Sequence, residues 1–511
     1  MREYLFVHDL GTSGNKAAIF NINGTLIGSE VFPYPTYYPK DGWVEQDPED
    51  WWRAVCLSTK NLLEKTKIRP EEIACISFSA QMMGCLLVDK KGNPLRNMLI
   101  WADMRSSKQE AEMIRKIGLE EGYKKTGHRL SASYSAAKLL WIKENEPETY
   151  KRAYKMLHVK EYIIHRLTGK FVTDYSDACG TNLLDIEKKE WAEDILAALK
   201  IEQGLLPDLM SSSSVCGYLL ERAAENMSLI GGIPVVVGGG DGASACVGAG
   251  VVREGKAFAA LGSSSWISTA RKTPFFDKEM RTFNWIHLDK DLYTPNGTMQ
   301  AAGYSYSWYK ELLCREEKAL ASEQGISVYE CINKEISKSP PGANGLLYLP
   351  YILGERSPRW NHKARGAFIG VSATTTKSEL SRSVLEGVGF NLKIILDILE
   401  QELTIEDLIV IGGGAKGRIW MQILADIFQK SLHLPRHLDE ATSIGAAICG
   451  GIGVGVFDGF DAVSQFNQIV ETVEPNPKNK ELYEKMACAF ESGYQGLLRT
   501  YDALSGLQEN N

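Results

Sequence analysis

The chain has 511 residues, a formal net charge of −7, 44% hydrophobic residues and 24% charged residues. A chain of this length exceeds one ordinary hydrophobic core, so we expect a folded protein with at least two domains. The mild acidity, with no basic stripe to neutralise phosphates, argues against nucleic acid as the main partner.

The first half of the chain is predicted to begin with three strands. Residues 4–32 read as strand, Gly-rich turn, strand, Asn23-Gly24 turn and strand, because Asn-Gly between apolar runs is a strong hairpin signal. A helix with a start at Asp47-Pro48 follows, and then a buried strand in residues 73–80. Helices dominate from about residue 110 to 230, before the buried strand "IPVVVGGG" in residues 233–240.

The second half repeats this scheme. Residues 255–270 read as strand, small-residue turn and strand; residues 403–428 as strand, Gly-rich turn and helix; and residues 442–455 as a small-residue helix. We therefore expect a duplicated α/β fold with a cleft between the halves. The predicted domains are residues 1–250 and 251–455, followed by a C-terminal helical extension, residues 456–511.

No segment suggests secretion or a membrane. No apolar stretch approaches the roughly 20 residues of a membrane span, and the N-terminal residues do not read as a signal peptide. The ten cysteines are scattered without a CxxC pair, as expected of buried thiols in a reducing compartment. We expect a cytoplasmic protein with no membrane partner.

Two Gly-Ser turns, one at the start of each half, could bind phosphate. "DLGTSGNK" (9–16) and "LGSSSW" (261–266) combine glycines and hydroxyls, and such tight turns expose backbone N–H groups that cradle anions. Asp9, at the end of a strand, could hold Mg²⁺ directly or through water. The alternative is two unrelated hairpin turns, with Asp9 as a local cap. A nucleoside triphosphate between the halves would need loops from both sides.

The Gly-rich turn "GGGAKG" (412–417) is open to two interpretations. It fits GxGxxG after a strand, and Asp439 or Glu440 follows at about the spacing of a dinucleotide site, which an oxidoreductase would use. No clear parallel strand series follows its helix, however. A Gly-rich turn that opens a helix also suits an adenosine or its phosphates, and a simple packing turn is a third reading.

Asp241 is a lone acid in "VVVGGGDGASACVGAG" (235–250). Its small neighbours would let a substrate approach closely, and a carboxylate there could accept the proton of a hydroxyl that attacks a γ-phosphate. The other reading is a cap for the helix that follows. The two readings are compatible.

Two segments after strands could contact a polyol: "SAQMMG" (79–84) and "WADMRS" (101–106). Gln81, Asp103 and Arg105 offer polar groups, whereas Met82, Met83 and Trp101 offer an apolar wall. Met and aromatic residues are more often part of a core.

Taken together, these motifs resemble the FGGY carbohydrate kinases. "SYSAAKLLWIKEN" (133–145) and "GAFIGVSATTTKSELSRSVLE" (366–386) are similar to the two family signatures. "DLGTSG", "GGGD", "GSSS", "YLPYILGERSPRWN" and "GGGAKGRIWMQILAD" stand in family order. The resemblance covers residues 4–455. It implies a two-domain actin/hexokinase-like (ribonuclease H-like) ATPase fold that phosphorylates a hydroxyl of a small-molecule sugar or polyol with ATP and Mg²⁺, and it is compatible with a homodimer.

The resemblance also assigns residues to roles. Asp241 is the general base, and Asp9 and Asp241 hold Mg²⁺, largely through water. The nucleotide and its phosphates are assigned to Gly11, Thr12, Ser13, Gly262, Ser263, Gly303, Gly413, Gly414 and Lys416. The sugar is assigned to Gln81, Met82, Met83, Trp101, Asp103, Asp241 and Gly242.

Within the family, the chain is most similar to xylulokinases, through "EQDPEDWW" (45–52) and "VKEYIIHRLTGKFVTDYSDACGT" (159–181). This implies transfer of the γ-phosphate of ATP to D-xylulose, giving D-xylulose 5-phosphate. Met83, Ala102 and Gly242 stand where xylulokinases usually have His, Asn and Asn, so three sugar hydrogen bonds are in question. "WADMRS" and "GERSPRWN" also resemble gluconokinases, and kinases for another pentulose, hexulose or polyol stay open. The distant alternatives are an actin-like ATPase without a sugar and a dinucleotide-binding oxidoreductase.

Overall fold

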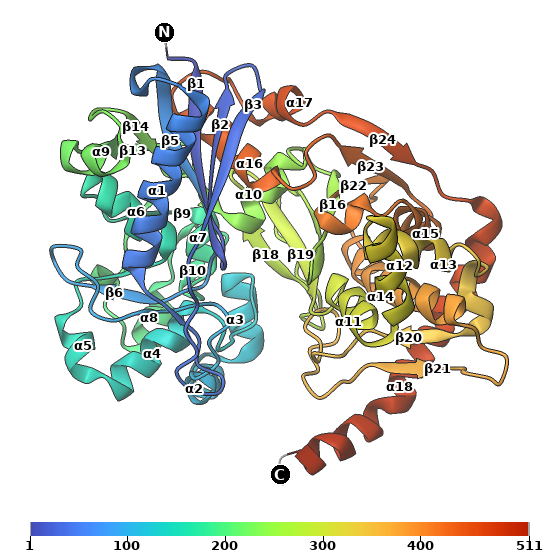
Figure 1. Cartoon of the computed structure of the whole chain (residues 1–511). Helices are drawn as coiled ribbons and strands as arrows, with labels where there is room; N and C mark the ends of the chain where they lie inside the picture. Colours follow the sequence, from blue (N-terminus) through green and yellow to red (C-terminus); the bar gives the residue numbers. More distant parts are fainter. Residues whose placement is uncertain (1, 509–511) are drawn as a thin grey trace.

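The computed structural model describes residues 2–508 and contains two large mixed sheets that lie side by side (Figure 1). The first sheet has the order β13 (Val215–Tyr218), β14 (Pro234–Val236), β5 (Ile73–Ala80), β1 (Tyr4–Leu10), β2 (Gly14–Asn21) and β3 (Leu26–Pro33), and β15 (Gly239–Gly240) also pairs with β5. The second has the order β24 (Ile469–Val473), β23 (Ser431–Pro435), β22 (Asp407–Ile411), β16 (Ala257–Leu261), β17 (Ser265–Thr269), β19 (Tyr293–Met299) and β18 (Phe283–Ile286).

The two sheets share a six-stranded topology, to which the second sheet adds β18 as a further antiparallel strand, and this confirms the predicted duplication. In each sheet, three strands are joined in an antiparallel series, β1–β2–β3 and β16–β17–β19. In each, two further strands continue in parallel from the first strand, and an antiparallel strand closes the edge. The chain therefore folds as the two-domain actin/hexokinase-like arrangement that the motifs predicted.

Short sequence motifs correctly predicted the positions of several of these elements. Gly24 has φ +90° in the predicted Asn-Gly turn between β2 and β3, a conformation that costs glycine little. Helix α1 (Pro48–Thr66) begins at the predicted Asp47-Pro48, where the Asp47 side chain accepts a hydrogen bond from the Glu49 N–H. Strand β5 is buried along its whole length, as expected of a strand with helices on both faces.

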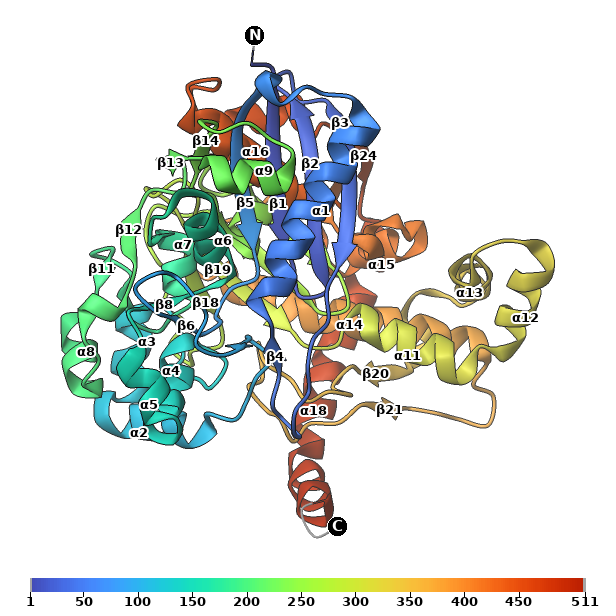
Figure 2. The ribbon, with the colours of Figure 1, turned by 60° about the vertical axis from the view of Figure 1, so that its left-hand side comes forward.

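Helices cover the outer faces of both sheets. On the first sheet these are α1, α6 (Val159–Thr168) and α9 (Glu221–Met227). On the second they include α14 (Lys377–Leu399) and α15 (Arg418–Phe428), and α18 (Lys480–Gln508) packs against these two helices. Helices α11 (Gly303–Leu313), α12 (Arg315–Gln324) and α13 (Val328–Ile336) extend to one side of the second sheet (Figure 2).

Two helices fill the space between the sheets and belong to both halves. Helix α10 (Asp241–Gly248) contacts the first sheet through Ala243 and Val247 and the second through Ala245 and Cys246. Helix α16 (Ala441–Gly453), which comes late in the chain, packs on β1 and β5 of the first sheet. Since α10 begins with Asp241, this shared layer couples the site to both domains.

The remaining elements form smaller units around these sheets. The helices are α2 (Ser107–Ile117), α3 (Leu119–Thr126), α4 (Ser135–Asn145), α5 (Pro147–Arg152), α7 (Tyr175–Cys179), α8 (Glu193–Leu199) and α17 (Val463–Phe466). The paired short strands are β4 (Glu45–Gln46) with β7 (Met98–Leu99), β6 (Leu86–Val88) with β8 (Lys155–Leu157), β9 (Val172–Asp174) with β12 (Asp208–Met210), β10 (Leu184–Asp185) with β11 (Glu190–Trp191), and β20 (Leu347–Leu349) with β21 (Ala367–Ile369). The segment after residue 455 is not helical throughout, because its strand β24 joins the second sheet. The division of the chain at residues 250 and 455 stays a prediction.

Within residues 2–508, none of the helices is long and apolar enough to cross a bilayer. All ten cysteines are free thiols, and all except Cys488 are buried, as the scattered spacing predicted.

Candidate functional site

Two aspartates come together where neighbouring strands of the first sheet end. Asp9 on β1 pairs in register with Ser79 on β5, and Gly239 on β15 pairs with the same Ser79 from the other side. Asp241 follows two residues after Gly239, as the first residue of α10. Gly240 therefore occupies the N-cap position, and the reading of Asp241 as the cap itself is wrong by one residue.

The Asp241 carboxylate has an unusual electrostatic environment. The side chain is accessible to solvent, yet surrounding protein desolvates it, which raises its pKa to about 7, and the nearby Asp9 raises the pKa further. The Gly242 N–H donates to its Oδ1 at 2.8 Å and acts in the opposite direction. A carboxylate with a pKa near neutrality is well matched to accept a proton at pH 7.

Asp9 connects the first sheet to the segment that enters α16. The Thr442 hydroxyl donates to its Oδ2 at 2.6 Å. On the neighbouring strand, the Lys16 ammonium donates to the Asp439 carbonyl at 2.8 Å and pairs with Glu440 at 3.3 Å. These contacts join residues that are more than 400 positions apart in the sequence. The turn after β1 and the start of α16 therefore form one side of the candidate site.

The first Gly-Ser turn is held by buried amide side chains. The Gln46 amide donates to the Thr12 carbonyl at 2.7 Å, and the Trp101 indole donates to the Thr12 hydroxyl at 3.0 Å. The Gln81 amide donates to Gln46 at 2.7 Å and lies 3.4 Å from the Gly11 carbonyl. The structure therefore brings Gln81 and Trp101, predicted at the sugar, directly against the predicted phosphate turn, while Ser13 is exposed.

Met82 lies against the backbone that precedes Asp241, and Met83 lies against Gly180. A Cβ added to Gly240 would lie 2.4 Å from the Met82 sulfur, and one added to Gly180 would lie 3.1 Å from the Met83 Cγ. A Cβ added to Gly242 would meet nothing within 4 Å. The space beside the Asp241 carboxylate is therefore open on the Gly242 side and closed on the Met82 side.

Asp103 has a different setting from the other predicted sugar residues. It is fully buried, and its carboxylate accepts from the Val44 N–H at 2.6 Å and from the Arg105 guanidinium at 2.7 Å. Arg105 in turn lies 3.7 Å over the Trp43 ring. In this geometry the Asp103 carboxylate is engaged by Val44 and Arg105, so a direct sugar contact by Asp103 stays a prediction that these bonds do not favour.

Three glycine-containing segments of the second domain meet at the end of β16. The Gly303 N–H donates to the Gly262 carbonyl at 3.0 Å, and a Cβ on Gly303 would lie 2.5 Å from that oxygen. The Tyr304 N–H donates to the Ser263 carbonyl at 3.0 Å. A Cβ on Gly414 would lie 2.8 Å from that of Leu261. Side chains at Gly303 and Gly414 would force these three segments apart, so the glycines allow the close backbone approach.

The segment around Gly413 and Lys416 faces more open space. A Cβ on Gly413 would meet nothing within 4 Å, and Lys416 is exposed and paired with Asp439 at 2.5 Å. The strand β23 runs parallel to β22 after α15, so the expectation that no parallel strand follows this turn is wrong. The acids that a dinucleotide site would use are instead engaged, Asp439 by Lys416 and Glu440 by Lys16.

A buried polar network that sequence reasoning missed supports the backbone before Asp241. The Ser176 hydroxyl donates to the Asp174 carboxylate at 2.5 Å and accepts from the Gly240 N–H at 3.0 Å. Asp174 is paired with the buried Lys160 at 3.0 Å and also accepts from the Ser212 hydroxyl at 2.8 Å. The signal was present in "VKEYIIHRLTGKFVTDYSDACGT", where charged residues interrupt buried elements. Ser176 thus positions the peptide unit next to the candidate base.

A neighbouring Ser–His–Asp arrangement belongs to the same buried network. His158 lies 2.8 Å from the Ser135 hydroxyl and 2.7 Å from Asp177. Although burial opposes it, the charges of Asp177 and Glu161 raise the pKa of His158. Ser135 is fully buried, so a substrate cannot reach it. His158, Glu161 and Asp177 also have the spacing of metal ligands, but the Lys160 ammonium lies 3.5 Å from Asp177 and opposes a cation there.

The chain matches known proteins over nearly its whole length. Residues 4–248 match the model of the N-terminal domain of the FGGY family of carbohydrate kinases, and residues 257–454 match the model of its C-terminal domain. A xylulose kinase of Lactococcus lactis subsp. lactis is 35% identical, covering 94% of this chain and 95% of its own. A gluconokinase of Bacillus subtilis is 30% identical, covering 100% and 97%. A solved structure described as ligand-bound xylulose kinase from Lactobacillus acidophilus superposes with a TM-score of 0.91 at 27% identity, covering 98% of this chain and 99% of that one.

Proposed function

The chain belongs to the FGGY family of carbohydrate kinases, and from this premise we propose that it transfers the γ-phosphate of ATP to a hydroxyl of D-xylulose to form D-xylulose 5-phosphate. The choice of D-xylulose rests on the similarity to xylulose kinases, which are 31% to 35% identical over nearly the whole chain. The family itself implies ATP as phosphate donor and a small-molecule sugar as acceptor.

Asp241 acts as the general base in this proposal. Its carboxylate is accessible to solvent at the start of α10, and its pKa is raised to about 7 by desolvation and by Asp9. The sugar hydroxyl donates its proton to Asp241 as its oxygen forms a bond to the γ-phosphorus, and the bond to the β-phosphate oxygen breaks to release ADP. The apolar side chains of Met82 and Met83 exclude water from one side of the acceptor.

The phosphates of ATP bind between the Gly-Ser turns of the two domains. The N–H groups of Gly11, Gly262 and Gly303 donate to backbone carbonyls and shape the two turns, and the backbone N–H groups of Thr12, Ser13 and Ser263 stabilise the charge that develops on the transferred group. The adenosine lies against the glycine turn at Gly413 and Gly414, next to the exposed Lys416. Support comes from the close approach of these backbones and from the open space at Gly413.

The donor atoms around Asp9 fit Mg²⁺. Two carboxylates, Asp9 and Asp241, are near enough for one to raise the pKa of the other, and the Thr442 hydroxyl bonds Asp9. Hard oxygen donors of this kind are the ligands that Mg²⁺ prefers. In this proposal Asp9 and Asp241 hold the ion largely through water, and the ion supplies charge neutralisation for the phosphates.

Gluconate is the second candidate acceptor. A gluconokinase that covers the whole chain is 30% identical. The space beside Gly242 is open, so no side chain at that position selects which polar groups of the sugar are bound. When a site lacks a hydrogen-bonding partner for one group of the sugar, the ratio of kcat/KM between two sugars changes by a large factor.

The test is an ADP-release assay with purified protein over pentuloses, hexuloses, polyols and aldonic acids. D-Xylulose should give a kcat/KM clearly above every other compound, and a higher value for gluconate would reverse the order of the two candidates. Asp241→Ala should retain ATP binding, measured by titration, and lose nearly all transfer. Near-normal turnover in that variant would eliminate Asp241 as the base.

The same proposal includes a homodimer in the cytoplasm. Nine buried free thiols are compatible with a reducing compartment. Light scattering of the purified protein measures the oligomeric state, and cell fractionation measures the location.

A further inference from the structure

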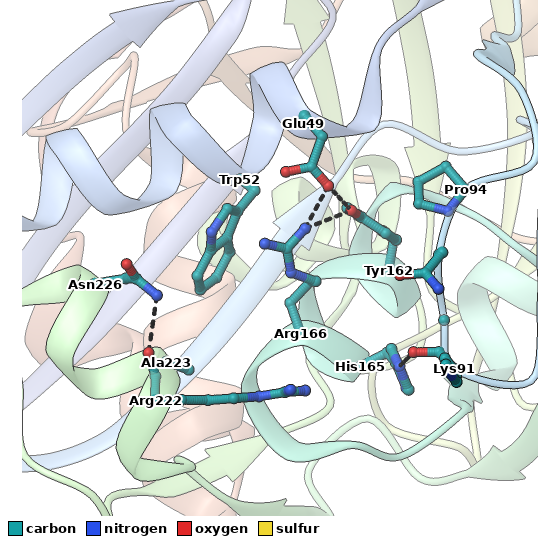
Figure 3. Close-up of a pocket in the computed structure, with 12 residues that line it drawn as sticks. Glu49, Trp52, Lys91, Pro94, Tyr162, His165, Arg166, Arg222, Ala223 and Asn226 are labelled. Carbon is teal, nitrogen blue, oxygen red and sulfur yellow. Dashed lines mark hydrogen bonds and ion pairs between the residues drawn. The ribbon is translucent and has the colours of Figure 1, made fainter.

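A cavity of about 440 Å³ opens on the outer face of the first domain (Figure 3). It lies among α1, α6, α9 and the turn at residues 91–94. These helices cover one face of the first sheet, whereas α10 and α16 cover the other. The cavity is therefore separate from the site between the two domains.

The lining of the cavity is strongly basic. Lys91, Arg166 and Arg222 contribute three positive charges, and Glu49 is the only acid among the lining residues. Burial holds the pKa of His165 below its usual range, and the nearby Arg222 and Arg166 lower it further, so its ring is neutral at pH 7. The net charge of the lining is about +2 by this count of formal charges.

Arg166 is held rigidly, with part of its guanidinium left to bind a ligand. One nitrogen donates to Glu49 at 2.5 Å and to the Tyr162 hydroxyl at 2.7 Å, as the dashed lines in Figure 3 show. The guanidinium lies 4.6 Å over the Trp52 ring. A planar guanidinium fixed in this way is well suited to a phosphate, because little rotational freedom is lost on binding.

Lys91 and Arg222 are the unpaired charges of the cavity. Within residues 2–508 neither the Lys91 ammonium nor the Arg222 guanidinium forms an ion pair or a side-chain hydrogen bond. Figure 3 shows the Arg222 side chain extended toward His165. Two unpaired cations around one concave surface favour a multivalent anion between them.

The turn that carries Lys91 is rigid as well. The Asp89 carboxylate accepts from the backbone N–H groups of Lys91 and Asn93 and from the Asn93 amide. Gly92, at φ +80°, lies against His165, where an added Cβ would come within 1.9 Å of the ring nitrogen. The Asp89 charge is thereby directed at the amides of its own turn, and the backbone that carries Lys91 is held at the rim of the cavity.

We propose that this cavity binds a phosphate monoester of a small polar molecule. Its volume lies in the range of about 300 to 1,000 Å³ that is common for small-molecule sites, so it exceeds the size of a phosphate ion and leaves room for an organic part. The dianionic phosphate binds between Arg166, Arg222 and Lys91 and balances their excess charge. The organic part contacts the apolar surfaces of Trp52 and Pro94. This site does not depend on the identity of the sugar that is phosphorylated.

Calorimetry with the full-length protein tests the proposal, with glycerol 3-phosphate, glycerol and inorganic phosphate as probes. Glycerol 3-phosphate should bind the wild-type protein, and Lys91→Gln and Arg222→Gln should each weaken this binding at least tenfold. Lys90→Gln is the matched control, because Lys90 is exposed on the same turn but does not line the cavity. It should bind like the wild type.

Each other outcome has a definite meaning. Equal affinity in all four proteins, or equal binding of glycerol and glycerol 3-phosphate, would overturn the proposal. Inorganic phosphate that binds as tightly as the monoester would overturn the role assigned to the organic part. Lys91 and Arg222 are exposed, so both variants should fold, and their phosphate-transfer rate without added phosphate monoester should equal that of the wild type. A failed sugar assignment would leave these measurements unaffected.

Discussion

The crossing of α10 and α16 allows a sharp test of how the fold positions the site. A Cβ added to Gly445 of α16 would lie 2.0 Å from the carbonyl oxygen of Ser244 in α10, whereas ordinary contacts begin at 3.4 Å. The opposing atom belongs to the backbone, so a side-chain rotation cannot relieve the clash. Gly445→Ala must therefore separate the two helices by more than 1 Å.

The expected free-energy change follows from two opposed terms. Overpacking of a close contact costs about 1 to 3 kcal/mol, and a backbone clash of this size belongs near the upper limit. Alanine in place of glycine inside a helix returns about 0.5 to 1 kcal/mol. We expect Gly445→Ala to lower the free energy of unfolding by about 2 kcal/mol. Asp241 lies three residues before Ser244, so kcat should also fall by about 100-fold, a typical loss for a misplacement of about 1 Å.

Urea denaturation and steady-state kinetics measure these two effects, and Gly496→Ala is the matched control. Gly496 lies within α18, where an added Cβ would meet nothing within 4 Å. The same substitution there should raise the free energy of unfolding slightly and leave kcat unchanged. If Gly445→Ala unfolds at the wild-type urea concentration with normal kcat, the close crossing does not position the site.

Two further predictions concern the groups around Asp241. Ser176→Ala removes the acceptor of the Gly240 N–H and should lower kcat about tenfold with little change in KM. Ser212→Ala removes a different hydroxyl from the same Asp174 oxygen and should retain kcat. Equal kinetics in the two variants would refute the positioning role of Ser176. The folded-state pKa of Asp241, about 7, is raised above its usual value, so its ionisation destabilises the folded protein as the pH rises toward 7 and the full cost is present above that pH. Asp241→Asn should therefore raise Tm relative to the wild type at pH 8, with a difference that disappears near pH 4. A constant difference across this range would contradict the shift.

The sequence by itself determined the elements that depend on neighbouring residues. The Asn23-Gly24 turn, the start of α1 at Pro48 and the buried strand β5 follow from local conformational preference and local hydrophobic pattern. The repeated strand and turn units predicted the duplicated fold, and motifs in family order predicted a carbohydrate kinase. The helix after Asp241 was also expected, although its first residue was displaced by one position because Gly240 and Asp241 both suit a helix start.

Only the tertiary structure decided which distant residues meet. It brings the Thr442 hydroxyl within hydrogen-bond distance of Asp9, and the Ser176 hydroxyl within hydrogen-bond distance of the Gly240 N–H. It also turns Asp103 inward toward Arg105, whereas the motif "WADMRS" alone predicts a sugar contact. Such contacts depend on the packing of buried surfaces that are far apart in the sequence. The residues next to a charged side chain in the sequence therefore do not predict which group it will pair with. The basic cavity has the same origin, since its cations come from three separate segments that become neighbours only when the first sheet is covered by its helices.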